Sequence, residues 1–328
     1  MATNRREFIV VLGGACFVWP LAARAQARIP RIGVLWHAGS AEEEGRYFTG
    51  FIEGLRDLGY TDGFNIILEH RFPNEMPDRF RKMAAELVSL NVDVLVGVGS
   101  QTAYYVKDAT NTIPIVFIFV PDPVGAKFVI SLARPGGNAT GLTHFAADLI
   151  GKRLQFLKET IPGLSHVALL VNPDTQVARL YTDVTDTIAT KLGLTNHTFS
   201  ARSRDELEPA FDAMVKAGMQ AVTINSEGLA YQQREFIANL AIARRLPLSV
   251  WSRETLEAGA LMSYGADQVA MCRRAAVFVD KILKGGKPAD LPVEEPTKIE
   301  FLLNQKTAKA LGLTFPKTLL IAATDVFE

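Results

Sequence analysis

Arg31-Ile-Gly-Val-Leu-Trp36 opens the first of two similar series of short apolar runs, and His166-Val-Ala-Leu-Leu-Val171 opens the second. Each run is followed by a polar turn and then by a segment of helix length. The runs lie at 31–36, 65–70, 92–97 and 113–117, and again at 166–171, 195–199, 220–224 and 246–250. Strands that alternate with helices indicate βαβ units and parallel sheets. The fold is therefore predicted to be α/β, with two matching lobes and a cleft between them.

Segments with helical spacing separate these runs. Apolar residues in 47–58 recur every three or four positions, and the segment stops at Gly59, which suits a helix end. Further helices are predicted at 78–90, 176–192, 204–217 and 231–245.

The remaining segments break this pattern. The stretch 133–141 holds one proline and three glycines and is predicted to be a turn near the join of the lobes. Beyond Asp267 the repeat ends: a long helix to Lys284, an extended stretch, a helix around 304–311 and a strand at 319–322 are predicted.

The pattern divides the chain into a leader and two lobes. The leader is 1–27, the N-terminal lobe is 28–143 plus about 265–290, and the C-terminal lobe is 144–264 plus about 291–328. The tail is too short for a third domain and is expected to cross between the lobes. We therefore expect a hinge of several strands.

The leader has the features of an export signal. The pair Arg5-Arg6 precedes an apolar stretch from Phe8 to Leu21, and small residues suit cleavage near Ala25 or Ala27. We expect a processed periplasmic protein, with Sec and twin-arginine export both left open.

Composition and motif content narrow the classes of function. The formal net charge is zero and no basic cluster occurs, which argues against nucleic acid as a partner. The five histidines lack metal-ligand spacing, and no nucleophile elbow, P-loop or His-Glu-x-x-His motif is present. Gly97-Val-Gly99 lacks the third glycine of a dinucleotide fingerprint, where Thr102 stands. We expect no enzyme activity, no cofactor and no metal.

Candidate ligand contacts follow from the rule that ligands bind beyond the carboxyl ends of parallel strands. In the first lobe, the loop holding Ser100, Gln101 and Thr102 is predicted to receive a carboxylate at a helix start, and a plain helix cap is the alternative. Ser226 and Glu227 occupy the equivalent loop of the second lobe, where Glu227 suits a ligand ammonium or, equally, a solvated helix start.

Other strand-end residues complete the predicted site. Aromatic walls are expected from Trp36, Trp251 and Tyr264, with core packing as the alternative for each. Polar contacts are expected from His37, Asp122 and Asp174, although Asp122 suits a rigid turn and Asp174 a helix cap.

Five strings give a resemblance to a known family. They are 50–60, 122–124, 132–141, 282–292 and 304–313. Together they resemble the ABC-transporter substrate-binding proteins that include tryptophan- and tyrosine-type binding proteins. The resemblance implies a periplasmic-binding-protein type I fold, with two Rossmann-like lobes, three crossovers and closure around a solute.

The function that follows is solute capture for an ABC importer. The ligand is expected to be an amino acid or a small aromatic or apolar carboxylate, and the partner an inner-membrane permease. The protein is expected to be a monomer. A ligand-presenting sensor and an exported Rossmann-like enzyme are the alternatives.

Overall fold

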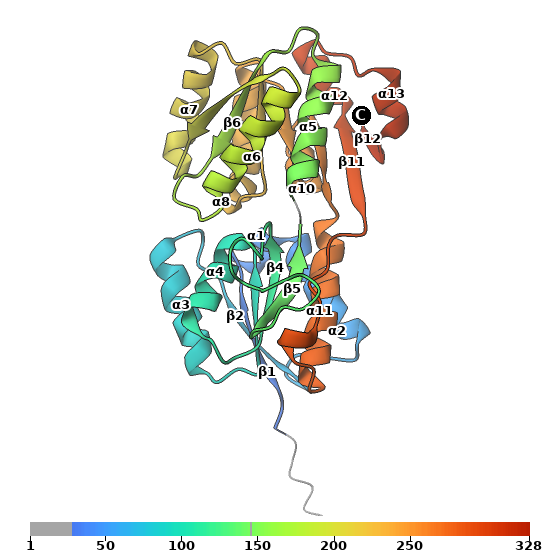
Figure 1. Ribbon diagram of the computed structural model, residues 1–328. Helices are drawn as coiled ribbons and strands as arrows, with labels where there is room; N and C mark the ends of the chain where they lie inside the picture. The colour runs from blue at the N-terminus through green and yellow to red at the C-terminus, as the bar shows by residue number, and fades with distance from the viewer. Residues whose placement is uncertain (1–27, 145) are drawn as a thin grey trace, which may run out of the picture.

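The computed structural model describes residues 28–144 and 146–328. The predicted leader lies outside these residues. Two lobes stand one above the other in Figure 1, each built on one β-sheet with helices on both sides. No helix in the described part of the chain is long and apolar enough to cross a membrane.

The sheet of the N-terminal lobe is fully parallel, in the order β2-β1-β3-β4-β5. The central strands β3 and β4 are buried throughout, which explains their unbroken apolar sequence. The bounds are β1 Arg31–Leu35, β2 Ile67–Arg71, β3 Val94–Val98, β4 Ile115–Val120 and β5 Ala139–Thr143.

Two helix layers enclose this sheet. Helices α2 and α11 pack together on one face, and α3 and α4 cover the other. The bounds are α1 Ala41–Glu44, α2 Arg46–Asp57, α3 Pro77–Ser89, α4 Ser100–Ala109, α11 Gln268–Leu283 and the 3₁₀ turn η1 Pro288–Asp290.

The sheet of the C-terminal lobe has the order β12-β11-β10-β9-β8-β6-β7. Its first five strands in the chain reproduce the order of the other lobe, which confirms the repeat predicted from the sequence. The additional strand β11 runs antiparallel to β10, and β12 runs parallel to β11. The bounds are β6 His166–Val171, β7 Thr195–Ser200, β8 Ala221–Ile224, β9 Leu248–Val250, β10 Met262–Ala266, β11 Ile299–Asn304 and β12 Asp325–Phe327.

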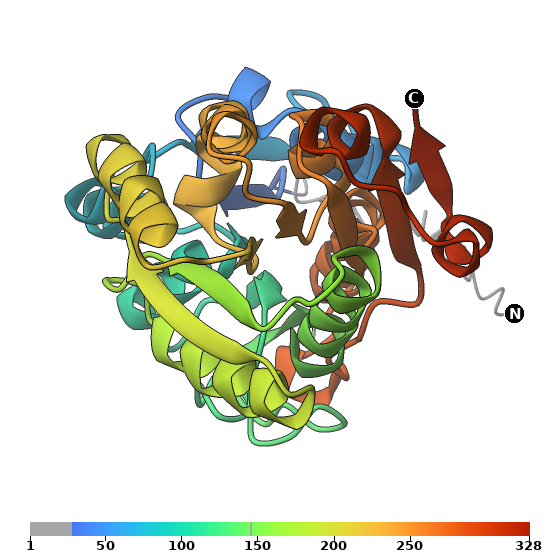
Figure 2. The same cartoon turned by 90° about the horizontal axis from the view of Figure 1, so that it is seen from above.

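Helices flank both faces of this second sheet, as Figure 2 shows from above. Helices α5 and α6 share one buried cluster with the sheet, and α7 and α9 share the other. The bounds are α5 Ala146–Thr160, α6 Ala178–Lys191, α7 Arg204–Lys216, α8 Gly228–Gln232, α9 Arg234–Ala243, α10 Arg253–Glu257, α12 Gln305–Leu311 and α13 Lys317–Ala322.

The glycine-rich stretch 133–141 is not only a turn, as the sequence predicted, because its last residues begin β5. Gly141 has φ 151°, and a Cβ at this position would lie 1.9 Å from the carbonyl oxygen of Phe117. The glycine therefore lets β5 approach β4 closely, and a strand that contains such a glycine is easily taken for a turn.

The strand predicted at 319–322 is wrong, because these residues belong to helix α13. Pro316 precedes the helix, and its carbonyl accepts bonds from the N–H groups of Leu319 and Leu320. Leu319 is buried while Ile321 is 85% exposed. Only one side of this apolar run packs on the protein, which suits a short surface helix and not a buried strand.

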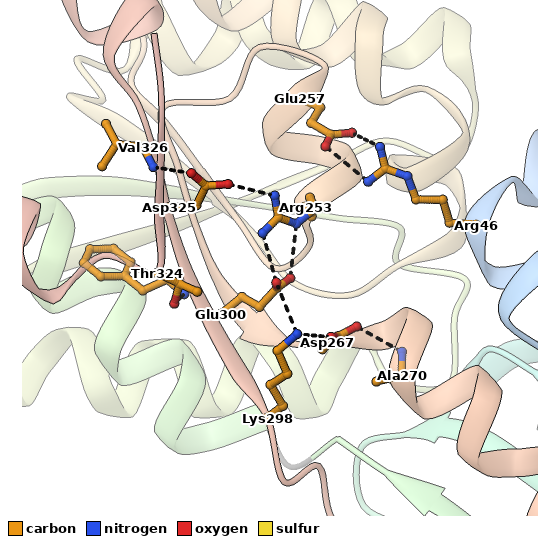
Figure 3. A network of polar contacts seen from close by, with 11 residues as sticks. Arg46, Arg253, Glu257, Asp267, Ala270, Lys298, Glu300, Thr324, Asp325 and Val326 are labelled. Atoms are coloured by element: carbon orange, nitrogen blue, oxygen red, sulfur yellow. Dashed lines mark hydrogen bonds and ion pairs between the residues drawn. The ribbon is translucent and has the colours of Figure 1, made fainter.

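The chain passes between the lobes three times: between β5 and α5, between β10 and α11, and between η1 and β11. Ion pairs brace this side of the molecule (Figure 3). Lys298 bonds Asp267 at 2.7 Å, and Asp267 also caps α11. Arg253 binds Glu300 at 3.0 Å. These ion pairs therefore link residues that lie next to the crossings between the lobes.

Candidate functional site

A cavity of about 50 Å³ lies where the two lobes meet, and we call it the main cavity. It is formed by strand-end loops of both sheets, as expected for parallel α/β sheets. The N-terminal lobe contributes His37, Tyr47, Glu75, Gly99, Ser100, Gln101, Phe119 and Gln268. The C-terminal lobe contributes Thr175, Gln176, Val177, Ser226, Glu227, Gly228, Tyr231 and Trp251.

The N-terminal side of the main cavity is acidic around one histidine. His37 follows β1, and its Nε2 lies 3.3 Å from Glu44 while its Nδ1 lies 3.3 Å from Glu75. Glu44 is fully buried and also accepts the backbone N–H groups of His37 and Ala38. Burial opposes protonation of His37, but the surrounding carboxylates outweigh it and raise its pKa to about 9. His37 therefore carries a charge at neutral pH.

A carboxylate of the C-terminal lobe faces this cluster. Glu227 caps α8 and accepts the N–H groups of Leu229 and Ala230 at 3.2 and 2.9 Å. Burial, and then the nearby charge of Glu75, raise the pKa of Glu227 to about 7. A Cβ on Gly228 would lie 1.9 Å from Glu75 Oε1, so a larger residue here would push the Glu75 side chain aside. Two acidic groups thus meet across the cleft.

Aromatic rings supply the apolar walls. Tyr47 of α2 and Tyr231 of α8 stack across the cleft with ring centroids 4.8 Å apart. Phe119 lies at an irregularity in β4 and has φ 68°, which takes it out of the regular strand conformation at the cavity. Trp251 completes the wall from the end of β9. Such rings suit a flat or apolar ligand group, and they also favour a nearby cation.

Direct contacts hold the two lobes together around the main cavity. Arg46 of α2 forms a two-point ion pair with Glu257 of α10, at 2.9 and 3.2 Å (Figure 3). The Gln232 side chain donates to Asn74, and the Tyr47 hydroxyl donates to Glu254 at 3.2 Å. The structure is therefore that of a closed cleft.

A smaller cavity of about 10 Å³, room for about one water molecule, adjoins the main cavity and shares Ser226, Trp251 and Gln268 with it. We call it the side cavity. Its remaining lining is His144, Leu149, Arg153, Tyr181, Asn225, Gly265 and Ala266. Burial of Arg153 lowers the pKa of its guanidinium to about 10, so the group stays charged at neutral pH.

Six of the residues predicted from the sequence line the main cavity. They are His37, Ser100, Gln101, Ser226, Glu227 and Trp251. Five others do not line it: Trp36, Thr102, Asp122, Asp174 and Tyr264. A contact between any of the eleven and a ligand stays a prediction.

The hydroxyls at the start of α4 bond to the backbone. Ser100 lines the main cavity and donates to the Phe119 carbonyl at 2.8 Å. Thr102 is fully buried and donates to the Gly99 carbonyl at 2.7 Å. This bond is not a helix cap, because Gly99 occupies the cap position of α4 and no side chain caps it, so the alternative that the sequence left open is wrong.

The aromatic residues Trp36 and Tyr264 pack within the lobes. Trp36 is fully buried, stacks on Phe72 with centroids 6.2 Å apart and donates its indole N–H to His70. Tyr264 packs edge-on against Phe156. Trp36 follows β1 directly and packs against Phe48 and Phe51 of α2, and Tyr264 lies within β10, so neither lines the main cavity.

The two aspartates act locally. Asp122 accepts the N–H of Gly125 at 2.8 Å within a turn. Asp174 is exposed and lies 3.4 Å from Arg202. The residues that follow Asp174, from Thr175 to Val177, do line the main cavity.

Sequence reasoning missed several residues of the site, above all Tyr47, Glu75, Phe119 and Tyr231. Tyr47 and Tyr231 lie in helices, and Phe119 lies in an apolar strand, so each has the pattern of a core residue. Sequence reasoning also missed two buried ionisable residues, Glu44 and Arg153. Their positions in ordinary helical segments gave no sign of burial.

The fold and the cleft define a class: a two-lobed α/β protein of the periplasmic-binding-protein type I fold, with a cavity between its lobes. No cluster of three or more potential metal ligands occurs among the described residues. The ABC transporter substrate binding protein family model matches residues 40–327. The chain belongs to this family.

Known relatives agree with this assignment. A "Tyrosine-binding protein" of Clostridioides difficile (strain R20291) is 26% identical over 265 residues, which are 80% of this chain and 76% of the relative. A crystal structure of a conserved domain protein from Vibrio cholerae has a TM-score of 0.85 at 27% identity and covers 91% of this chain and 100% of its own. An ABC domain in complex with L-Trp from Streptococcus pneumonia has a TM-score of 0.84 at 24% identity, covering 91% and 99%.

Proposed function

We propose that this chain is the periplasmic solute-binding component of an ABC importer and captures an amino acid with an aromatic or apolar side chain. The observation that carries the proposal is the main cavity, because both lobes build it and it combines carboxylates with aromatic walls. Membership of the substrate-binding family supports it. So does the similarity to a tyrosine-binding protein and to a domain in complex with L-Trp.

In this proposal the ligand ammonium lies against Glu227 and Glu75. These carboxylates approach one another from opposite lobes, so their repulsion disfavours a closed, empty cleft. A bound ammonium pairs with Glu227 and offsets this repulsion, while Glu75 keeps its pair with the charged His37, so the equilibrium shifts toward closure. The aromatic rings of Tyr47, Tyr231 and Trp251 hold the side chain, and the closed form docks on the permease.

The test is a thermal-shift screen of the mature protein against the twenty amino acids. A ligand that binds the folded state at about 100 times its dissociation constant adds roughly 2.7 kcal/mol to the free energy of unfolding. We expect the largest shifts from aromatic and large apolar amino acids. A screen in which no amino acid raises the melting temperature, while a sugar or an inorganic anion does, would overturn the proposed ligand class.

A further inference from the structure

A buried cation in the side cavity has no carboxylate beside it. Arg153 is 3% exposed. Its Nη1 donates to the Tyr264 carbonyl at 2.9 Å and its Nη2 donates to Asn225 Oδ1 at 2.5 Å. Its Nε has no hydrogen-bond partner. Within 28–144 and 146–328 no ion pair includes Arg153. A buried charge without a counter-charge is strongly unfavourable, so an anion is expected beside it.

The neighbours of Arg153 do not supply that anion. His144 lines the same cavity, and burial followed by the charge of Arg153 lowers its pKa to about 4, so it is neutral at pH 7. Its Nδ1 also lacks a partner. Burial raises the pKa of the Tyr181 hydroxyl well above its usual range, which keeps it protonated. The side cavity therefore holds one positive charge and neutral polar groups.

The loop after β8 connects this positive charge to the acidic side of the main cavity. Asn225 accepts the bond from Arg153, Ser226 lines both cavities, and Glu227 faces Glu75. This loop of three residues thus contacts the Arg153 cation at Asn225 and carries the carboxylate of Glu227 at its other end. A ligand beside Ser226 meets positive charge on one side and negative charge on the other.

We propose that the Arg153 guanidinium anchors the carboxylate of a zwitterionic ligand, with one carboxylate oxygen in the water-sized side cavity. The inference rests on the proposed function, because the ammonium of the same ligand lies at Glu227. Arginine suits this role, since its N–H donors form a fixed fork that matches a carboxylate. The ligand class is then an α-amino acid whose two charges are both recognised, in preference to an amine or an acid alone.

The test compares L-tryptophan with tryptamine, which lacks the carboxylate, in calorimetric titrations of the wild type and Arg153→Met. Loss of a hydrogen bond to a charged group lowers affinity roughly 10- to 150-fold. We expect this loss for L-tryptophan with Arg153→Met and no change for tryptamine. Arg153→Lys keeps the charge without the fork and should fall between. Equal losses for both probes, or unchanged L-tryptophan binding, would overturn the subsite.

A second experiment uses formate in place of an amino acid. Formate at constant ionic strength should raise the melting temperature of the wild type but not that of Arg153→Met. The matched control is Arg179→Met, whose arginine is 93% exposed, and it should respond as the wild type does. If the wild type binds neither tryptophan nor tryptamine, the proposed amino-acid function fails and the formate arm still decides the subsite. Equal formate responses in all three proteins, or none in any, would refute it.

Discussion

The two lobes share one strand order but differ in the chemistry of their equivalent loops. After the third strand of the N-terminal lobe, Ser100 and Thr102 use their hydroxyls to bond backbone carbonyls. After the third strand of the C-terminal lobe, Glu227 presents a carboxylate of raised pKa to the other lobe, and Asn225 holds Arg153. The repeat of the fold therefore does not extend to the site. We propose that ligand charge is recognised mainly where the two lobes differ.

The same contrast appears after the first strands. His37 follows β1 and is surrounded by the carboxylates of Glu44 and Glu75. After β6, Asp174 is exposed and pairs with Arg202 at the surface. The N-terminal lobe thus concentrates buried charge at its first strand and the C-terminal lobe at its third. Four predictions test this comparison.

The largest effect is expected from Glu227→Gln, which keeps the shape of the side chain and removes its charge. Affinity for an amino acid should fall roughly 10- to 150-fold, because the ammonium loses a charged partner. Isothermal calorimetry measures it. Glu257→Gln is a matched control, since Glu257 crosses the cleft to Arg46 without lining the main cavity. If both variants lose affinity equally, closure and not ligand recognition explains the effect.

A smaller effect is expected from pH. The raised pKa of Glu227, about 7, makes its charged form dominant only above that pH. Binding of an ammonium favours the charged form, so affinity should rise about tenfold from pH 6 to pH 8. The groups that face Glu227 are Glu75, His37 and the N–H groups of Leu229 and Ala230. His37, with a pKa of about 9, stays protonated through most of this range.

Stability of the empty protein should change in the opposite sense. Because the folded-state pKa of Glu227 exceeds its unfolded value, the folded state binds more protons between about pH 4.5 and 7, and the free energy of unfolding falls as pH rises through that window. Partial exposure limits the effect to roughly 1–2 kcal/mol. Glu227→Gln should flatten both pH profiles. A variant that keeps the wild-type profile would assign the titration to another group.

The smallest effect is expected from Thr102→Val. The hydroxyl bonds the Gly99 carbonyl and does not line the main cavity, so ligand affinity should stay within about twofold of the wild type. The free energy of unfolding should fall by roughly 0.5–1.5 kcal/mol from the lost hydrogen bond. Chemical denaturation and calorimetry together separate these quantities. A tenfold loss of affinity would instead give the β3 loop a direct part in recognition.

The fold was predictable because its signals are local and periodic. Eight apolar runs and the helices between them gave two lobes with parallel sheets, and the strand order bears this out. Two segments were misread. The sequence around Gly141 suggests a turn, but strand β5 lies there and needs the glycine for its close approach to β4. The apolar run 319–322 suggests a strand, but it is a helix with only one buried side.

The site was predictable only where a residue follows a strand in the chain. That rule found His37, Ser100, Glu227 and Trp251 at the main cavity. It did not find Arg153, which lies inside α5 and is buried only because the strands of the same lobe pack over it. Nor did it find Glu75 before α3. Burial of charge is a tertiary property, so a single sequence gives little sign of it.

The central claim is that the cleft recognises both charges of an amino acid. The most direct measurement is calorimetric titration of the wild type with L-tryptophan or L-tyrosine, whichever the thermal screen ranks higher. The same amino acid is then compared with its amine and with its deaminated acid. The account predicts that the amino acid binds at least about tenfold more tightly than either analogue. An analogue that binds as tightly as the amino acid would contradict the account, because one of the two charged regions would then contribute nothing to recognition.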